Sequence, residues 1–498
     1  MKPIQLLLLG ALGVAASSAA AFDVGLDPGV TYPALAPASG SGTVFVGLPP
    51  DGVLKYSTVS IPNGVTVKFN RNVPSTPVVM LVQGSISIAG IIDVSGGEAP
   101  GAGNAGTGNL ADDGEPGRGG PGGYDGGRGG PLGSFWGGAG LGPGGGGPGY
   151  FVPCNVTYYA VSGAGGGFSA LGETAGPNPL NCAGQIIQRP TQGATYGSSQ
   201  LLPLIGGSGG GGGAGGYNFG GAGGGGGGGA ILIAASGALT LTNTGQILAN
   251  GGKGGGVGGT GVGGPGGGGS GGAIRLVATS MTISGQLRAL QGDYGRHEFD
   301  SGTQVYQGGR GSLGRIRLEA DTVPPVTGSP QATTGTPGAL VIAGLPTLRI
   351  ARVAGVDVPP VPTGNRDVLL PADTQNPVTV EFQTTGVPAG NTVVLVVTPG
   401  NAPPFSKRSP ALVGDSVNAS ASVTVDLPGG HSVLSANTTY QIVVGLGESL
   451  SRYAMGERVD SIRLSATLSG VTTVTLITVS GKEFELPAAA WTELAGAS

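Results

Sequence analysis

The chain has 498 residues, of which 10% are charged, and its formal net charge is −4. A weakly charged, mildly acidic chain argues against nucleic acid or an anionic membrane surface as a partner. The 108 glycines far exceed the usual share of about 7%, yet 39% of the residues are hydrophobic, which is too many for a disordered chain. The composition therefore predicts a β-type core with glycine segments inserted into it, in two or three domains.

The first residues are typical of a secretory signal peptide. Lys2 precedes an apolar run over 4–16, which is too short to span a bilayer, and Ala19 and Ala21 form an A-x-A site. We expect cleavage after Ala21 and a mature chain that begins at Phe22 and is secreted to the cell surface or beyond. No later apolar run reaches about 18 residues, so we predict no membrane span.

Residues 22–55 form a lead-in segment rich in Pro, Gly and Ser, which is expected to lie over the first coil or stay loose. The first predicted strand covers 65–69. It follows the turn Pro62-Asn63-Gly64, where both Asn and Gly tolerate positive φ.

An internal repeat occupies residues 56–322. Each copy consists of short alternating strands joined by small-residue corners, and the copies are residues 78–97, 229–252, 272–292 and 314–323. The corresponding Ile231, Ile274 and Ile316 are 43 and 42 residues apart. We predict an all-β fold in which this domain is a parallel β-helix or solenoid, because stacked coils bury inward faces that one coil cannot. An antiparallel barrel or sandwich could use the same alternation, but long insertions at one phase of the repeat favour stacking.

One side of the alternation should form the core. The predicted inward residues are Ile231, Ile233, Leu239, Leu241, Ile247, Ile274, Leu276, Met281, Ile283, Leu287, Ile316 and Leu318. The remaining residues of each repeat are glycine tracts, and the largest insertion covers 98–228. Ordering one glycine costs about 1–2 kcal/mol, whereas a hydrogen bond returns about 1 kcal/mol, so a lone tract should be mobile. Neighbouring tracts could instead bond to one another as extended helices of the polyglycine-II type.

Two cysteines, Cys154 and Cys182, lie in this largest insertion. In an exported protein, a pair that closes such a loop most often forms a disulfide, worth roughly 3 kcal/mol. The cysteines have neither CxxC spacing nor a nearby histidine, which argues against a metal site. We therefore predict a disulfide between them.

The composition changes after residue 322. Residues 323–338 read as a linker, and short strand-like runs between Pro, Gly and Asn turns then predict an immunoglobulin-like or fibronectin-like β-sandwich over 339–450. Residues 451–498 supply further strands, which either complete the sandwich or form an assembly tail that pairs with another molecule.

The sequence DYGRHEFD, residues 293–300, holds the densest group of functional side chains. Parallel β-helices include polysaccharide lyases and hydrolases, which need clustered carboxylates. The candidate catalytic residues are Asp293, His297, Glu298 and Asp300. A solvated loop that gathers the few charges of the chain is the favoured alternative, so we predict no catalytic site, although Tyr294 could contact a saccharide.

A second acidic group could offer oxygen ligands to calcium. Its members are Asp112, Asp113, Glu115 and Asp125. The chain has no EF-hand loop and no repeated GGxGxDxUx spacing, so we predict no metal site. The GGxGG strings lack a following GxxxxGK[ST] motif, and we therefore predict no nucleotide and no other cofactor.

Four strings carry a resemblance: LLPLIGGSGGGGG (201–213), GGAILIAASG (228–237), GGSGGAIRLVA (268–278) and GRIRLEA (314–320). They resemble a widespread group of uncharacterised, secreted, glycine-rich bacterial repeat proteins, from which no activity can be transferred. More loosely, the tracts are similar to the polyglycine-II sandwiches of phage tail-fibre adhesins, where glycine helices support variable binding loops.

Two functions are compatible with these features. The favoured one is a non-enzymatic structural or adhesive protein of the bacterial cell surface or extracellular matrix, whose partners are further copies of itself or a surface polymer. The alternative is a carbohydrate-active or carbohydrate-binding β-helix protein, with a polysaccharide as its partner.

Overall fold

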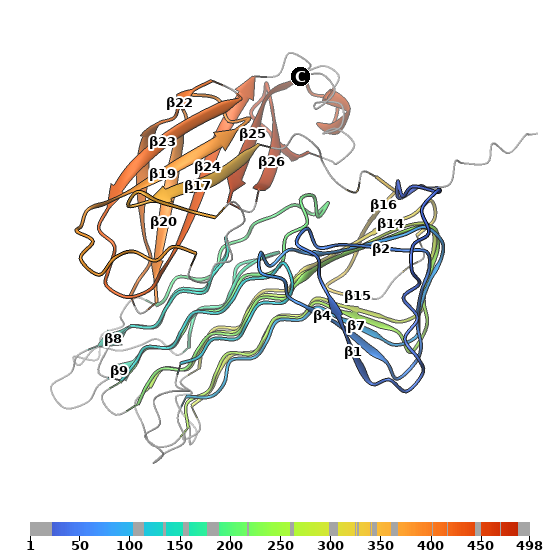
Figure 1. The fold of residues 1–498 in the computed structure, drawn as a ribbon, viewed down its shortest axis with the longest axis horizontal. Helices are drawn as coiled ribbons and strands as arrows, with labels where there is room; N and C mark the ends of the chain where they lie inside the picture. The colour runs from blue at the N-terminus through green and yellow to red at the C-terminus, as the bar shows by residue number, and fades with distance from the viewer. Residues whose placement is uncertain are drawn as a thin grey trace, which may run out of the picture.

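The computed structural model describes most of the chain beyond residue 21. The described residues are 22–102, 114–132, 136–152, 159–176, 189–216, 219–258, 263–297, 307–323, 325, 328–338, 340, 346–359, 367–400, 402–415, 417–443, 450–468 and 470–486. Within them the chain is all-β, apart from one 3-10 turn, η1 (Ser451–Tyr453) (Figure 1). The predicted signal peptide and both cysteines lie outside the described residues.

Two parallel sheets form the N-terminal half. The first parallel sheet contains, in spatial order, β16 (Thr333–Gly335), β14 (Arg315–Glu319), β12 (Ala273–Ile283), β10 (Ala230–Leu241), β5 (Val78–Val82) and β2 (Val53–Tyr56), with β6 (Ile86–Ile88) and β3 (Val59–Ile61) beside the second half of β10. The second parallel sheet contains β1 (Thr43–Gly47), β4 (Thr66–Asn70), β7 (Ile91–Asp93), β11 (Gln246–Leu248), β13 (Gln286–Arg288) and β15 (Gly328–Ser329). Successive passes of the chain thus add strands to both sheets in the same order.

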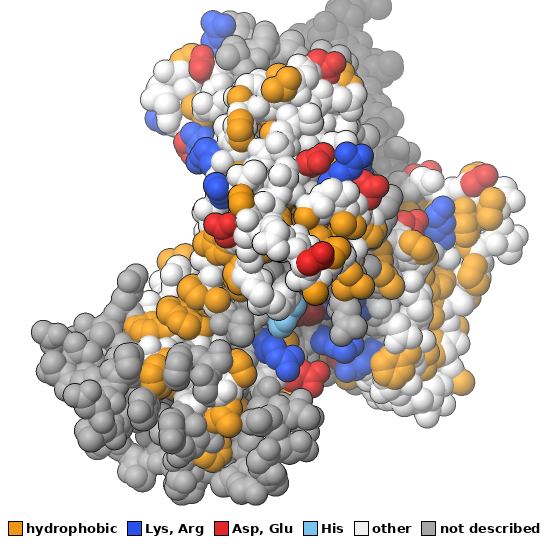
Figure 2. Space-filling model, turned by 60° about the vertical axis from the view of Figure 1, so that its left-hand side comes forward, with side chains coloured by type: hydrophobic (Ala, Val, Ile, Leu, Met, Phe, Trp, Pro, Cys, Tyr) orange, Lys and Arg blue, Asp and Glu red, His pale blue; other side chains and the backbone are white. Residues whose placement is uncertain are grey.

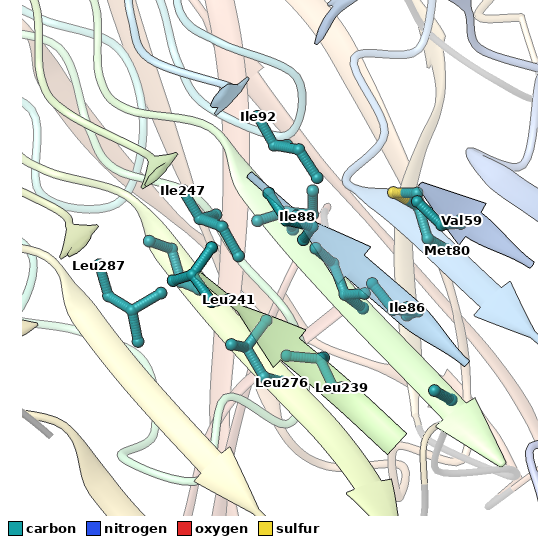
Figure 3. Packing of buried hydrophobic residues seen from close by; sticks show 14 of the residues in the cluster. Val59, Met80, Ile86, Ile88, Ile92, Leu239, Leu241, Ile247, Leu276 and Leu287 are labelled. Carbon is teal, nitrogen blue, oxygen red and sulfur yellow. The ribbon is translucent and has the colours of Figure 1, made fainter. Parts of the chain in front are cut away.

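The register of the first parallel sheet places equivalent residues of the repeat side by side. Ile231 is aligned with Ile274, and Ile274 with Ile316. These three residues belong to one hydrophobic core, to which the second parallel sheet contributes Ile247 and Leu287. Figure 3 shows part of this core, in which Leu241 and Leu276 lie near these two side chains. Of the twelve predicted inward residues all but Ile283 are buried there. Ile283 is only partly buried because β14 ends at Glu319 and supplies no strand opposite it.

Two segments contain structure that their composition did not reveal. The lead-in segment 22–55 carries β1, and its Val24 and Leu26 pack against Leu232 on the outer face of the first parallel sheet. The segment 323–338, expected as a linker, carries β15 and β16, which extend the two parallel sheets. These strands are two and three residues long, too short for an alternation to be visible in the sequence.

The glycine tracts lie side by side and are bonded to one another (Figure 1). Outgoing tracts leave the second parallel sheet, and returning tracts lead back into the first. The outgoing tracts cover 94–102, 249–258 and 289–297, the returning tracts cover 219–229, 263–272 and 307–314, and further tracts cover 114–132, 136–150, 159–167 and 206–216. We call this array the glycine bundle. Of the two arrangements compatible with the sequence, the described residues adopt the cross-bonded one.

Hydrogen bonds in the glycine bundle repeat with a period of three residues. The N–H groups of Gly224, Gly225 and Gly226 donate to carbonyls of three different tracts, at 2.8, 2.8 and 3.0 Å. The acceptors for residues 224–229 are, in order, Gly127, Gly267, Gly97, Tyr124, Ser270 and Val94, so the fourth donor returns to the tract of the first. This rotation is expected of an extended helix with three residues per turn, whose N–H groups point in three directions.

Close approach of these tracts requires glycine. A Cβ atom built on Gly224, Gly225 or Gly226 would lie 2.0, 2.0 or 2.1 Å from a carbonyl oxygen of a neighbouring tract. No side chain can occupy such a space without displacing backbone, because the atom in contact is not the end of a flexible side chain. The glycines are therefore required by packing, not by a positive φ.

The C-terminal half consists of two antiparallel sheets around a separate core. The five-stranded sheet contains, in spatial order, β18 (Val356–Asp357), β17 (Thr347–Val353), β19 (Val378–Thr385), β23 (Asn418–Val425) and β22 (Val413–Gly414). The six-stranded sheet contains β21 (Phe405–Ala411), β20 (Thr392–Pro399), β24 (Ser432–Val443), β25 (Val459–Thr467), β26 (Gly470–Thr478) and β27 (Glu483–Glu485). Phe382 and Leu395 come from different sheets and share this core.

Described residues of the antiparallel unit contact the glycine bundle and its connections. The N–H and Oγ of Ser199 donate to the Glu485 carboxylate of β27, at 2.7 and 3.0 Å. Gly138 of the bundle also lies against Gly400, whose N–H donates to the carbonyl of His431. The hydrogen bonds of Ser199 and this close approach of backbone hold the C-terminal half beside the bundle (Figure 1).

We predict that Gly225→Ala disrupts the glycine bundle locally, because the added methyl group would meet the carbonyl of Gly252 at 2.0 Å. Overpacking of this kind costs about 3 kcal/mol, which corresponds to about a hundredfold loss of amide protection. Hydrogen–deuterium exchange of residues 219–229 and 249–272 measures it. Gly429→Ala is the matched control, because no atom lies within 4 Å of its Cβ position. Equal protection in the two variants would contradict the packing argument.

Candidate functional site

Four charged or aromatic side chains gather where an outgoing tract faces a returning one. Asp293, Tyr294 and Arg296 belong to the outgoing tract that follows β13, and Arg310 belongs to the last returning tract. Arg310 Nε donates to Asp293 Oδ1 at 3.0 Å, and an Arg296 guanidinium nitrogen donates to the Tyr294 hydroxyl at 2.7 Å. We call these four residues the Tyr294 cluster.

Tyr294 is held between two guanidinium groups. The Arg296 and Arg310 guanidinium carbons lie 5.0 and 4.9 Å from the centroid of its ring, which is within the range of cation–π contacts. The ring is buried, whereas Asp293 and Arg296 are exposed. The cluster therefore joins two tracts at the surface of the bundle through a packed ring and an ion pair.

The electrostatics of Asp293 suit an ion pair. Burial raises the pKa of the Asp293 carboxyl, but the hydrogen bond from Arg310, the N–H of Tyr294 and the charges of Arg310 and Arg296 together hold that pKa below its usual value. The same bond raises the pKa of the Arg310 guanidinium. These contacts favour the ionised carboxylate of Asp293, which is the form that pairs with Arg310.

The other residues of the DYGRHEFD candidate do not complete a catalytic pair in the described part of the chain. His297 forms a backbone bridge with Val257 of the neighbouring outgoing tract and is partly exposed. Glu298 and Asp300 lie outside the described residues. Arg310, which the cluster does use, is remote in sequence, and no local pattern linked it to Asp293.

The second acidic candidate contains a carboxylate that is already paired. Asp125 accepts hydrogen bonds from a guanidinium nitrogen of Arg71 and, at 2.7 Å, from the N–H of Gly119. Glu115 is exposed, and Asp112 and Asp113 lie outside the described residues. Among the residues that the structure describes, no group of three or more His, Cys, Asp and Glu side chains could hold a metal ion. Asp125 instead fastens the largest insertion to the chain after β4.

A buried ion network lies on the outer face of the first parallel sheet. Arg275 and Glu319 are 1% and 2% exposed, and two guanidinium nitrogens of Arg275 donate to the two carboxylate oxygens at 3.1 and 3.0 Å. Arg317 Nε and the N–H of Gly338 also donate to this carboxylate, at 3.2 and 3.1 Å. Such a bidentate and fully bonded carboxylate meets the conditions under which a buried ion pair is tolerated.

The repeat pattern contains a signal for this network that our sequence interpretation missed. The tripeptide IRL occurs at 274–276 and again at 316–318, and alternation sends both arginines to the outer face. Arg275 is aligned with Arg317, and Val277 with Glu319, in adjacent strands. An arginine repeated on an outer face predicts a carboxylate near it, but not that the lead-in segment buries this face.

The end of the bundle opposite the parallel sheets carries exposed apolar side chains. Gly130 donates to the carbonyl of Gly213, near the outer turn of its tract, so Leu132 and Trp136 lie at this distal end. They are 41% and 36% exposed, and the Trp136 ring is 5.5 Å from that of Tyr150. The strands β8 (Phe151–Val152) and β9 (Tyr159–Ala160) form a two-stranded sheet there (Figure 1).

Charged side chains elsewhere form small groups of mixed sign. Figure 2 shows them on one face, where acidic and basic groups lie near one another between uncharged areas. Exposed pairs such as Arg352 with Asp357 and Arg463 with Glu483 belong to this class. This distribution offers no large single-sign field on that face to attract a polyanion.

No protein-family description, curated protein or solved structure matches the chain in a comparison with known proteins. Within the residues that the structure describes, no helix is long and apolar enough to cross a membrane.

We predict that Glu319→Gln destabilises the parallel sheets by about 3–5 kcal/mol, because it leaves the buried Arg275 without a counter-charge. Denaturant unfolding followed by circular dichroism measures this loss.

Replacing all three charged members, in the variant Arg275→Met/Arg317→Met/Glu319→Leu, should restore stability to within about 1 kcal/mol of the unsubstituted protein. If Glu319→Gln were as stable as the unsubstituted protein, the network would contribute nothing to the fold.

Proposed function

We propose that the protein is a secreted, non-enzymatic structural or adhesive component of the bacterial cell surface or extracellular matrix. In this proposal the two parallel sheets are a parallel β-helix, the glycine bundle is of the polyglycine-II type, and the C-terminal half is an immunoglobulin-like β-sandwich. The secretory signal peptide that the sequence pattern of residues 1–21 predicts supports the location.

The observation that carries the proposal is the bonding of the glycine bundle. Its tracts satisfy backbone donors and acceptors in three directions, as residues 224–229 do. A tract bonded on all sides loses the freedom that makes a lone glycine segment mobile. Such a bundle is a rigid spacer, and it holds the distal end with Leu132 and Trp136 away from the parallel sheets.

The charged candidates support a structural role as well. Asp125 is paired with Arg71, Asp293 with Arg310, and Glu319 with Arg275. Each pair joins segments that are distant in sequence, which is the use expected of charges that fasten a fold. An acid/base pair would instead need two carboxyl groups with pKa values pushed apart.

We expect the distal end to make the adhesive contact. The variant Leu132→Ser/Trp136→Ala removes two exposed apolar side chains and should reduce binding of the purified protein to producer cells or their matrix at least tenfold. A cell-retention assay with labelled protein measures the effect. Leu369→Ser is the control, since Leu369 is 75% exposed on the antiparallel unit, and it should bind normally. Equal binding by both variants would exclude the distal end as the contact.

The alternative function is a carbohydrate-active or carbohydrate-binding protein. The observation in its favour is Tyr294, because an aromatic ring with two arginines could contact an acidic saccharide. On the structural or adhesive proposal, Glu298→Ala/Asp300→Ala leaves cell retention unchanged, and the protein releases no reducing ends from polysaccharides. Release of reducing ends by the unsubstituted protein, abolished in this double variant, would replace the proposal with the alternative.

A further inference from the structure

Strand β1 is an open edge of the second parallel sheet. In the described part of the chain it pairs only with β4, on one side (Figure 1). Its five residues, Thr43-Val-Phe-Val-Gly47, contain no charge and no proline. Unpaired edges of this kind are templates for pairing with another strand unless the protein protects them.

The other strands at sheet ends are protected or short. The end strands of only two or three residues are β3, β8, β9, β15, β16, β18, β22 and β27. Of the longer ones, β2 carries the exposed Lys55, and β21 carries Lys407, Arg408 and Pro410. Short length, charge and proline are the usual means of blocking edge pairing. Among the described sheet ends, β1 therefore stands out as the longest edge with none of these protections.

Backbone alternation shows which groups of β1 are free. The N–H of Thr66 donates to the carbonyl of Gly42 at 2.8 Å, and Thr43 is aligned with Thr66. In a parallel ladder this places the backbone groups of residues 42, 44 and 46 toward β4. The N–H and C=O groups of residues 43, 45 and 47 consequently point to the open edge, with Phe45 at the centre.

The side chains of β1 indicate an incomplete sheet. Val44 and Val46 point to the core but remain partly exposed, whereas Val67, which is aligned with Val44, is completely buried. On the outer face Phe45 is 61% exposed. A further strand beside β1 would cover all three of these apolar side chains.

We propose that β1 is the dimer interface of this protein and that its partner is β1 of a second copy, antiparallel about a two-fold axis at Phe45. The sequence of β1 is self-complementary in this pairing: Phe45 faces Phe45 of the partner subunit, and Val44 faces Val46 of the partner subunit. Phe45 then forms a hydrogen-bonded pair across the axis, and the second parallel sheets of the two copies become one continuous sheet.

The opposite end of the parallel sheets argues against head-to-tail stacking. A stacked copy would have to pair β1 with β15, which has two residues and is followed by Pro330. An edge this short supplies too few donors and acceptors to hold five residues of β1. The two-fold pairing uses β1 on both sides, so it closes as a dimer and does not continue as a filament.

The β1 dimer gives the self-association in the proposed function a defined surface. The dimer rests on the proposed function only for the expectation that copies of the protein associate. Retention by the distal end and pairing through β1 use different parts of the molecule. Failure of the dimer would leave the adhesive contact of Trp136 untouched, and the reverse also holds.

Size-exclusion chromatography with light scattering, on the purified full chain, tests the proposal. We expect the unsubstituted protein to be a dimer at high concentration. Phe45→Pro removes the central edge donor without breaking a bond to β4, and Phe45→Lys places two like charges opposite each other at the axis. Both should raise the dimer dissociation constant at least tenfold. Val413→Lys, at a 74% exposed position on the edge strand β22, should leave it unchanged.

Cysteine cross-linking tests the register. Directly opposed residues of a hydrogen-bonded pair have Cα atoms about 5.5 Å apart, a separation that a disulfide can span. Phe45→Cys should therefore yield a covalent dimer on a non-reducing gel. Thr43→Cys should not, because antiparallel pairing sets residue 43 opposite residue 47. A monomer at every concentration, a dimer that survives both Phe45 substitutions, or equal cross-linking through residues 43 and 45 would overturn the proposal.

Discussion

The structure depends on backbone hydrogen bonds between glycine tracts that approach more closely than any side chain permits. Gly225 donates to Gly267, and a Cβ on Gly225 would lie 2.0 Å from the carbonyl oxygen of Gly252. A single glycine tract is not expected to be ordered, because the free-energy cost of its lost conformational entropy exceeds the stabilisation from its hydrogen bonds. Order becomes favourable when a tract has neighbours in three directions, so the tracts stabilise one another.

The parallel sheets bring those neighbours together. Adjacent strands in a sheet lie about 4.8 Å apart, and each repeat sends its insertion out from the same phase of the coil. Ile231 is aligned with Ile274 in the core, while Gly225 bonds to Gly267 in the bundle, so both structures share nearly the same repeat. The hydrophobic core thus sets the spacing of the tracts. The ion pair of Asp125 fastens one tract to Arg71, and that of Asp293 fastens two tracts to each other.

Several charged residues connect distant segments of this chain. Glu319 joins two strands and the segment after β16, Asp125 joins the largest insertion to the first coil, and Glu485 joins the C-terminal half to Ser199. A chain with 10% charged residues has few surface charges to keep copies apart, which makes protection of sheet edges important. For this reason the unprotected edge of β1 is a stronger indication of an interface than an exposed edge would be in a highly charged protein.

The sequence by itself determined the all-β class, the position of the repeat and the inward residues of the parallel sheets, because an alternation of period two records directly which side chains face the core. It could not decide whether the glycine tracts are ordered, since that depends on neighbours as far apart as Gly97 and Gly226. It also could not pair Asp293 with Arg310 or bury Arg275 beside Glu319, because burial and ion pairing belong to the assembled fold. Local periodicity can be read from the sequence alone. Whether backbone and charged groups find hydrogen-bond and ion-pair partners is decided only when distant segments come together in the fold.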